Sequence, residues 1–332
     1  MTIEFRPAKR EAINLIIGLI SGTGGGKTRT ALRLATGMSD GKRFVVLDTE
    51  NRRALHYSDD FSFDHYDFKP PFRPERFTEA IKAADAAGYP VIVIDSASMI
   101  WAGEGGVLDW QEDELDRMAG DDWKKREAVK MASWIKPKMA HKAFVQSLLQ
   151  IKAHIILCLR SEQKIEMVRE NGKMVVHAKQ SLTSIDGHIP ICDKNLPFEL
   201  TASLLFTADS PGMPKPIKLQ SQHRELFPLD RQVDEASGKK IAEWAKGGTK
   251  AASQTSQATQ ASSEPADGVE YISVDAQTLF EDMLRGRYDL KESLLKKAGC
   301  VSLAMMPADK YSAALAWLKI KTDAESGSVK EK

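Results

Sequence analysis

The chain has 332 residues, of which 28% are charged and 42% hydrophobic, and its formal net charge is +1. This length suits one large domain with additions or two domains, and the near-neutral charge implies no polyanionic partner unless charges cluster locally. A polar N-terminus, no apolar run that could cross a bilayer, and three cysteines without C-x-x-C spacing argue against export, membrane insertion and a zinc site, and predict a cytoplasmic protein.

The first pattern along the chain is a phosphate-binding one. An apolar run, 13–20, leads into a glycine-rich turn, then into Lys27 and Thr28, and then into a helical pattern. Strand, glycine loop, Lys-Thr and helix in this order predict a P-loop that binds ATP. Lys27 would reach the β- and γ-phosphates, and the Thr28 hydroxyl would bind Mg²⁺. The residues predicted to bind the nucleotide are Gly22, Thr23, Gly24, Gly25, Gly26, Lys27, Thr28 and Arg29.

The loop departs from the usual pattern, G-x-x-x-x-G-K-[ST], at one position. That pattern places glycine at position 21, where this chain has Ser21. The remaining glycines leave the loop flexible, so Ser21 is interpreted as a tolerated variant. The alternative is a glycine-rich turn in an ordinary βα unit, which the Lys-Thr pair in register disfavours.

A second predicted strand, 43–47, runs directly into Asp48 and Glu50. We expect this strand next to the P-loop strand, where carboxylates at the carboxyl end lie at the ligand-binding edge of an open α/β sheet. Glu50 is then the candidate base that orients and deprotonates the attacking water. The alternative is that Asp48 and Glu50 belong to a solvated turn.

A third predicted strand resembles the Walker B pattern. Residues 58–75 are predicted as an irregular connection and 75–87 as a helix. Four apolar residues then end in Asp95, which would hold Mg²⁺ from the strand end. The residue after Asp95 is Ser96, so a catalytic carboxylate must come from elsewhere, and Glu50 is the obvious supplier.

The segments 48–50 and 91–96 together resemble the RecA-type ATPases. In that family the catalytic glutamate lies on this other strand, and serine typically follows the Walker B aspartate. Residues 12 to about 245 also resemble bacteriophage RecA-like AAA-family ATPases, some of which are minimal recombinases or single-strand annealing proteins. The resemblance implies an α/β fold, with a RecA-like P-loop NTPase core whose mainly parallel sheet is flanked by helices.

Charge changes sign along the next part of the chain. Residues 102–122 are acidic, whereas 124–142 are basic and contain interleaved tryptophans. Cations among aromatic rings suit single-stranded DNA, because lysines pair with phosphates and bases stack on rings. The alternative is a helix whose Met131, Trp134 and Ile135 face the core. The DNA-binding candidates are Lys124, Lys125, Arg126, Lys136 and Lys138.

A further predicted strand, 154–159, ends at Arg160. The resemblance implies a polar γ-phosphate sensor at this strand end, for which Arg160 and Gln163 are candidates. The alternative is that Arg160 is a surface arginine without a role. The Asn-Gly pair at 171–172 between two β-type runs predicts a hairpin. This hairpin occupies the chain position of the second DNA-binding loop of RecA-like proteins, and the alternative is a surface hairpin without that role. Its candidate phosphate contacts are Lys164, Arg169 and Lys173.

The end of the core and the rest of the chain complete the prediction. Residues 182–199 are predicted to be irregular and 200–206 to form a strand. The resemblance implies a basic residue that enters a neighbour's ATP site, with Lys218 and Arg224 as candidates, and hence a homo-oligomer. The predicted boundaries are a core over 1–245, a low-complexity linker over 246–268, a small helical module over 269–322 and a disordered tail over 323–332.

The sequence thus predicts a Mg²⁺-dependent ATPase that binds single-stranded DNA in phage recombination or replication, in the cytosol of a bacterial host. The helical module is predicted to bind DNA or a partner protein, such as a single-strand binding protein or another recombination or replication factor. The alternative is an accessory appendage without such a role. One alternative is an ATP-switched assembly or loader protein that acts on a protein partner. A lower-ranked alternative is a small-molecule P-loop kinase, which the lack of a clear Arg-rich lid disfavours.

Overall fold

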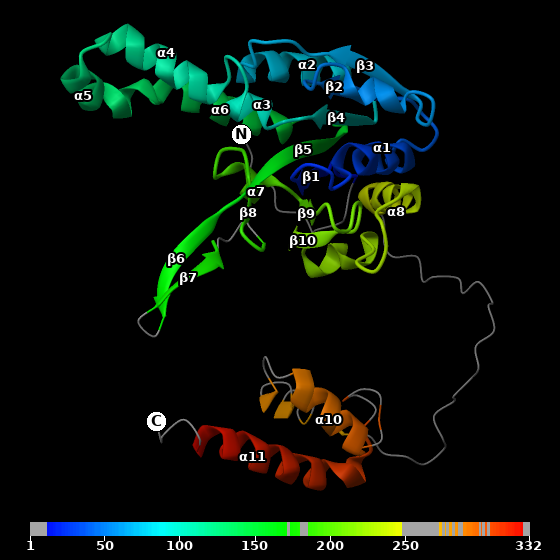
Figure 1. Cartoon of the computed structure of the whole chain (residues 1–332). Helices are drawn as coiled ribbons and strands as arrows, with labels where there is room; N and C mark the ends of the chain where they lie inside the picture. The colour runs from blue at the N-terminus through cyan, green and yellow to red at the C-terminus, as the bar shows by residue number, and fades with distance from the viewer. Residues whose placement is uncertain are drawn as a thin grey trace, which may run out of the picture. The chain divides into compact units, whose positions relative to one another are not determined.

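The computed structural model describes residues 12–170, 173–179 and 185–247, and, nearer the C-terminus, residues 272–273, 276, 279–280, 283–284, 288–298, 300, 303 and 306–327. The chain divides into two compact units, Met1–Ala252 and Ser253–Lys332 (Figure 1). In the described part of the chain, no helix combines the length and apolarity needed to cross a bilayer.

The larger unit is built on an eight-stranded sheet with the order β10-β9-β1-β5-β4-β2-β3, and β8 pairs with β5. The pairings among β9, β1, β5, β4, β2 and β3 are parallel, whereas β10 and β8 are antiparallel to their neighbours. This mainly parallel sheet with flanking helices confirms the predicted α/β P-loop fold. The strands are β1 (Ile16–Ser21), β2 (Phe44–Asp48), β3 (Phe63–Asp67), β4 (Val91–Asp95), β5 (His154–Gln163), β8 (His188–Pro190), β9 (Ala202–Phe206) and β10 (Lys215–Lys218).

Helices cover both faces of this sheet. The helices α1 (Lys27–Met38) and α8 (Glu235–Ala245) pack on one face, and α2 (Pro74–Ala86) and α6 (Ile135–Leu148) on the other. Alternate side chains of each strand enter the two cores, and in β1 these are Ile17 and Leu19 on one side and Ile16 and Ile20 on the other. Since both faces are buried, the strands appear in the sequence as continuous apolar runs.

Two paired elements project from this core (Figure 1). One is a helical pair, α4 (Val107–Ala119) and α5 (Trp123–Ser133), which follows the short α3 (Met99–Ala102). The other is an antiparallel ribbon of β6 (Ile165–Glu170) and β7 (Lys173–Ala178), which form a sheet of their own. The ribbon confirms the predicted hairpin strands, although its turn at 171–172 lies outside the described residues.

Three predictions about the core are wrong. The segment 58–75 is not irregular, because β3 pairs in parallel with β2 over Phe63–Asp67. Because many of its side chains are polar, the sequence of this segment does not indicate a strand, and pairing with β2 in the folded sheet stabilises it. The segment 182–199 contains β8 and a short helix, α7 (Leu196–Glu199). Finally, β2 does not lie next to the P-loop strand β1, because β5 and β4 stand between them.

The described residues of the smaller unit are mostly helical. They include α10 (Tyr288–Ala298), the 3₁₀ turn η4 (Ala308–Lys310) and α11 (Tyr311–Gly327). Its apolar core contains Phe280, Leu294 and Leu318. The helix α11 extends past residue 322, the predicted end of the module, because no proline or glycine interrupts it before Gly327. Of the predicted linker, residues 248–268 lie outside the described residues, as do residues 328–332 of the tail.

Candidate functional site

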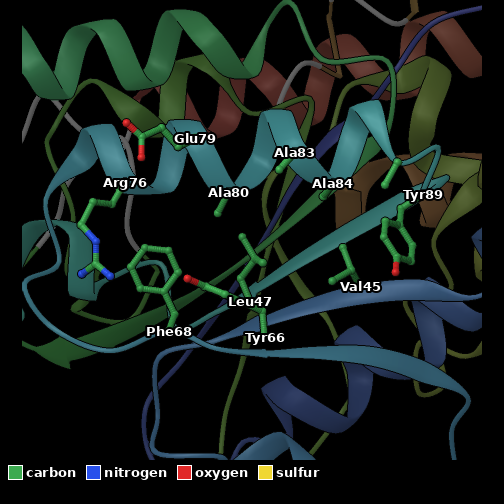
Figure 2. Close-up of a pocket in the computed structure, with 11 residues that line it drawn as sticks. Val45, Leu47, Tyr66, Phe68, Arg76, Glu79, Ala80, Ala83, Ala84 and Tyr89 are labelled. Carbon is green, nitrogen blue, oxygen red and sulfur yellow. The ribbon is translucent and has the colours of Figure 1, made fainter.

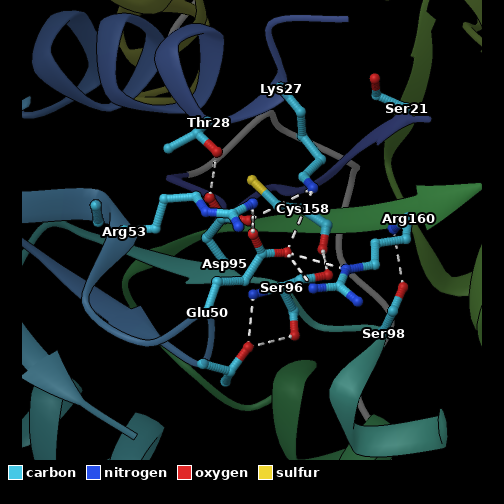
Figure 3. A network of polar contacts seen from close by, with 12 residues as sticks. Ser21, Lys27, Thr28, Glu50, Arg53, Asp95, Ser96, Ser98, Cys158 and Arg160 are labelled. Carbon is cyan, nitrogen blue, oxygen red and sulfur yellow. Dashed lines mark hydrogen bonds and ion pairs between the residues drawn. The ribbon is translucent and has the colours of Figure 1, made fainter. Parts of the chain in front are cut away.

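The carboxyl ends of several parallel strands meet at one cavity of about 580 Å³. Lys27 and Thr28 begin α1 after the P-loop, Glu50 follows the end of β2, and Arg160 lies within β5, beside the end of β1. All four line the cavity together with the glycines of the loop, and Figure 3 shows their polar contacts. The fold therefore gathers these four side chains and the loop glycines at the edge where open α/β sheets bind ligands.

The P-loop backbone takes a shape that requires glycine. Gly24 and Gly26 have positive φ values of 80° and 81°, and Gly26 is the N-cap of α1. A Cβ atom on Gly25 would lie 2.2 Å from Ser21 Oγ and 2.7 Å from the carbonyl oxygen of Phe206. This cradle directs backbone N–H groups and the start of α1 toward the cavity, an arrangement that suits phosphate. Ser21 is accommodated because its hydroxyl donates to the carbonyl of Gly22 over 2.7 Å.

Asp95 and Thr28 make the arrangement that a magnesium ion needs. The Thr28 hydroxyl donates to Asp95 Oδ2 over 2.5 Å, and Lys27 Nζ lies 3.7 Å from Oδ1. Asp95 Oδ1 is buried and accepts no hydrogen bond within the described part of the chain. Burial raises the pKa of this carboxyl above its ordinary range, and the neighbouring Lys27 opposes the rise. A buried carboxylate oxygen that accepts no hydrogen bond, beside a hydroxyl group, would gain from a bound cation.

The donor set also fits the way that proteins bind Mg²⁺. Among the described residues, no group of three or more His, Cys, Asp or Glu side chains could hold a metal by itself. Mg²⁺ usually binds through one or two protein ligands, with substrate phosphates and water completing its shell. Asp95 and Thr28 match that mode, so they would hold the ion when a triphosphate is present.

Asp48 holds the backbone that carries Glu50. This buried carboxylate accepts hydrogen bonds of 2.8 Å from the N–H groups of Glu50 and Ala54, and its Oδ2 lies 3.1 Å from His65 Nε2. The alternative that Asp48 lies in a solvated turn is wrong. Only the contact with His65 depends on β3, which the sequence did not indicate as a strand.

Glu50 itself is surrounded by cations. Its side chain is only 7% exposed, with Lys27 Nζ 4.0 Å from Oε1. Arg160 donates from Nε to Oε1 over 3.0 Å, and Arg53 donates from NH1 to Oε2 over 3.1 Å. Figure 3 shows the two arginines approaching Glu50. Sequence analysis did not identify Arg53, which lies three residues after Glu50 in the 3₁₀ turn η1 (Arg53–Tyr57).

Four other predicted site residues do not line this cavity. Arg29 is exposed on α1, and Gln163 contacts the carbonyl of Asp186 over 3.4 Å. Lys218 donates to the carbonyl of Phe198 over 2.7 Å, and Arg224 is exposed in the 3₁₀ turn η2 (Ser221–Leu226). Of the two sensor candidates, only Arg160 is at the site. A role of Lys218 or Arg224 in a neighbouring subunit stays a prediction.

Several of the predicted DNA-binding cations on α5 and α6 have acidic partners. Arg126 bonds to Glu112 and Asp116 of α4. Further pairs join Lys125 to Asp122 at 3.7 Å and Lys136 to Glu114 at 3.1 Å. Lys124 and Lys138 lie over the rings of Trp123 and Trp134. Phosphate binding by the paired cations would have to displace carboxylates.

The alternative interpretation of this region, with Met131 and Ile135 in the core, is wrong. Met131 is 82% exposed and Ile135 is 58% exposed. Trp134 does pack inward, where it stacks on Trp101 with ring centroids 6.1 Å apart.

The ribbon has a different character. Its apolar side chains are exposed: Ile165 and Met167 of β6 and Met174 of β7 are all more than half exposed. Arg169 is exposed, and Lys164 pairs with Glu162 at 2.7 Å. The ribbon strand β6 follows β5 almost directly, and Arg160 of β5 contacts Glu50.

A second cavity of about 450 Å³ lies between α2 and the strands β2 and β3 (Figure 2). Its lining is largely apolar, with Ala80, Ala83 and Ala84 from α2 facing Leu47 and Phe68. None of the P-loop residues lines it, so it is separate from the phosphate site.

The fold and the site define the chain as a P-loop NTPase. Residues 13–193, more than half of the chain, match the model of the AAA domain family, and the chain belongs to this family. A search of curated proteins found no match. The protein is therefore a nucleotide-binding member of the AAA and P-loop ATPase group.

Proposed function

We propose that the protein hydrolyses ATP in a Mg²⁺-dependent reaction with Glu50 as the base. The observation that carries this proposal is the convergence of Lys27, Thr28 and Glu50 on one cavity, directly beside Asp95. These are the groups that phosphoryl transfer to water requires: a phosphate cradle, a cation, metal ligands and a carboxylate for the nucleophile.

In the proposed reaction, water attacks the γ-phosphorus and the bond from that phosphorus to the β–γ bridging oxygen breaks. Glu50 orients the water and accepts its proton, and ADP and inorganic phosphate leave. Lys27 and the backbone N–H groups of the P-loop offset negative charge that develops on the phosphates. Mg²⁺ held by Thr28 and Asp95 would supply further positive charge there.

We further propose that the ribbon β6–β7 binds single-stranded DNA. The support is its place in the chain: β5 carries Arg160 at the ATP site and continues almost directly into the ribbon. Exposed Met167 and Arg169 offer apolar and cationic contacts to bases and phosphates. The ribbon is favoured over α5 because Arg126 and Lys125 already have acidic partners. A role in phage recombination or replication, and action as a homo-oligomer, rest on the family resemblance.

The test is ATP hydrolysis by the purified protein with and without a single-stranded oligonucleotide, at low and at high salt. Stimulation that falls at high salt is expected, because phosphate contacts release counterions. Replacing Arg169 with Gln should weaken the stimulation while leaving the rate without DNA unchanged. Replacing the exposed Lys82 of α2 with Gln is the matched control.

A second candidate function is an ATP-switched assembly protein that acts on a protein partner. The observation that favours it is the exposed apolar surface of α5 and α6, where Trp123 is 72%, Met131 82% and Met139 67% exposed. ATP binding and hydrolysis with no oligonucleotide binding at low salt would favour this candidate over the DNA-binding one.

A further inference from the structure

Both carboxylate oxygens of Glu50 are already engaged. Arg160 reaches Oε1 through Nε at 3.0 Å and NH2 at 2.9 Å, and Arg53 reaches Oε2 at 3.1 Å. A carboxylate that acts as a base needs a lone pair directed at the water that it deprotonates. Two contacts from Arg160 meet Oε1 and one from Arg53 meets Oε2, so few of the roughly four lone-pair positions of the Glu50 carboxylate are left for that role.

The two arginines are placed to meet a nucleotide. Both line the cavity that also contains the P-loop, so a γ-phosphate held by Lys27 would enter a space that they border. Guanidinium groups bind phosphate oxygens through paired, charge-assisted hydrogen bonds, and a terminal phosphate carries more negative charge than one carboxylate.

The side chain of Arg53 can change its contacts while its backbone stays in place beside the cavity. Its side chain is 68% exposed, so it can leave Glu50 at little cost in packing. Its backbone is fixed nearby, since Asp48 accepts from the N–H groups of both Glu50 and Ala54. The turn that carries Arg53 is thus held at the cavity while the side chain stays mobile.

We propose that Arg53 is a phosphate-contacting residue that exchanges Glu50 for the terminal phosphate of a nucleoside triphosphate. In the absence of that phosphate, Arg53 and Arg160 hold Glu50 away from water. When the triphosphate binds, Arg53 turns to it and one oxygen of Glu50 becomes available. The inference rests on the proposed ATP hydrolysis, in which Glu50 acts as the base.

The test compares two nucleotides that differ by one phosphate. The affinities of wild type, Arg53→Gln and Arg52→Gln are measured for Mg²⁺-ADP and for a Mg²⁺-bound non-hydrolysable ATP analogue. Arg52 is the matched control, since it is exposed, adjacent and cationic, yet is not among the residues that line the cavity. We expect Arg53→Gln to weaken binding of the analogue about 10-fold and binding of ADP less than about 2-fold. Arg52→Gln should change neither.

Two results would overturn the inference: equal weakening of both nucleotides by Arg53→Gln, which indicates a structural role, or unchanged affinity for both. These binding measurements do not require hydrolysis. If wild type binds the analogue but does not hydrolyse ATP, the proposed function fails while the result for Arg53 still stands.

Discussion

Thr28 at the start of α1 donates a hydrogen bond of 2.5 Å to Asp95 at the end of β4, although 67 positions separate them in the chain. The strand before the P-loop, β1, is not a neighbour of β4, because β5 lies between them. The pair that would hold Mg²⁺ therefore forms only when all three strands are assembled. Nucleotide binding should accordingly report on the correct folding of the whole sheet.

Replacing Lys27 with Ala should abolish nucleotide-dependent activity. Lys27 Nζ lies 3.7 Å from Asp95 and 4.0 Å from Glu50, so its removal takes away the positive charge that stands between these carboxylates and the phosphates. We expect ATP turnover to fall at least about 100-fold. Turnover of radiolabelled ATP is the measurement, with Lys82→Ala on α2 as control, and full activity of Lys27→Ala would refute the P-loop assignment.

Replacing Gly37 with Ala should destabilise the larger unit. A Cβ atom there would lie 2.0 Å from the carbonyl oxygen of Glu235, because α1 and α8 approach closely at Gly37 and Gly238. In an exposed helix the same change would stabilise by about 1 kcal/mol. Here we expect a loss of about 1–3 kcal/mol in the free energy of unfolding, measured by urea denaturation.

The exposed Thr36 on the same helix provides the control for this prediction. Thr36→Ala should change the free energy of unfolding by less than about 0.5 kcal/mol. A stability of Gly37→Ala equal to or above that of wild type would show that the two helices are not packed as described.

Stability should fall as the pH is lowered below about 6.5. Burial lowers the pKa of His141, His154 and His223 below the ordinary histidine value. As the pH falls below about 6.5, the folded protein therefore binds fewer protons than the unfolded chain. The contribution of these histidines to the free energy of unfolding is fully present above the histidine pKa of the unfolded chain, and it is progressively lost below that pKa. The melting temperature should therefore be lower at about pH 5.5 than at about pH 7.5.

Replacing His141 tests whether buried histidines cause this pH dependence of the melting temperature. His141 packs against the rings of Trp101 and Phe144, so Phe can occupy its place. His141→Phe should reduce the difference in melting temperature between the two pH values, whereas His56→Gln at an exposed position should leave it unchanged. An undiminished difference in His141→Phe would assign the pH dependence to other groups.

A chain that ends at Ala252 should fold and bind nucleotide as the full chain does. The boundary between the two compact units falls there, and the smaller unit has an apolar core of its own. Circular dichroism and nucleotide affinity of the shortened chain are the measurements. Loss of cooperative unfolding would contradict the division into independent units.

Sequence patterns predicted the parts of the site that depend on local order. The P-loop needs glycines, Lys27 and Thr28 in consecutive positions, and Asp95 ends an uninterrupted apolar strand. These are short-range signals, so the phosphate cradle and the Walker B strand were identified without the fold. The continuous apolar runs likewise indicated strands that are buried on both faces.

Features that depend on long-range pairing were missed. The strand β3 was predicted as irregular because its polar side chains mask a pairing with β2 that only the folded sheet supplies. The contact between Arg160 and Glu50 spans 110 positions, and the neighbouring Arg53 carries no motif that distinguishes it from other surface arginines. The pairing of Arg126 with Glu112 and Asp116 was also not predicted. The change from acidic residues in α4 to basic residues in α5 could have indicated that the two helices form ion pairs.

Replacing Glu50 with Gln tests whether Glu50 acts as the base of the proposed ATP hydrolysis. The measurement is the rate of phosphate release from Mg²⁺-ATP in a single turnover, together with the affinity for ATP. Gln is close in size but cannot accept the proton, so the rate should fall at least about 100-fold while ATP affinity is retained or increased. A rate equal to that of wild type would exclude Glu50 as the base and place the base on another residue.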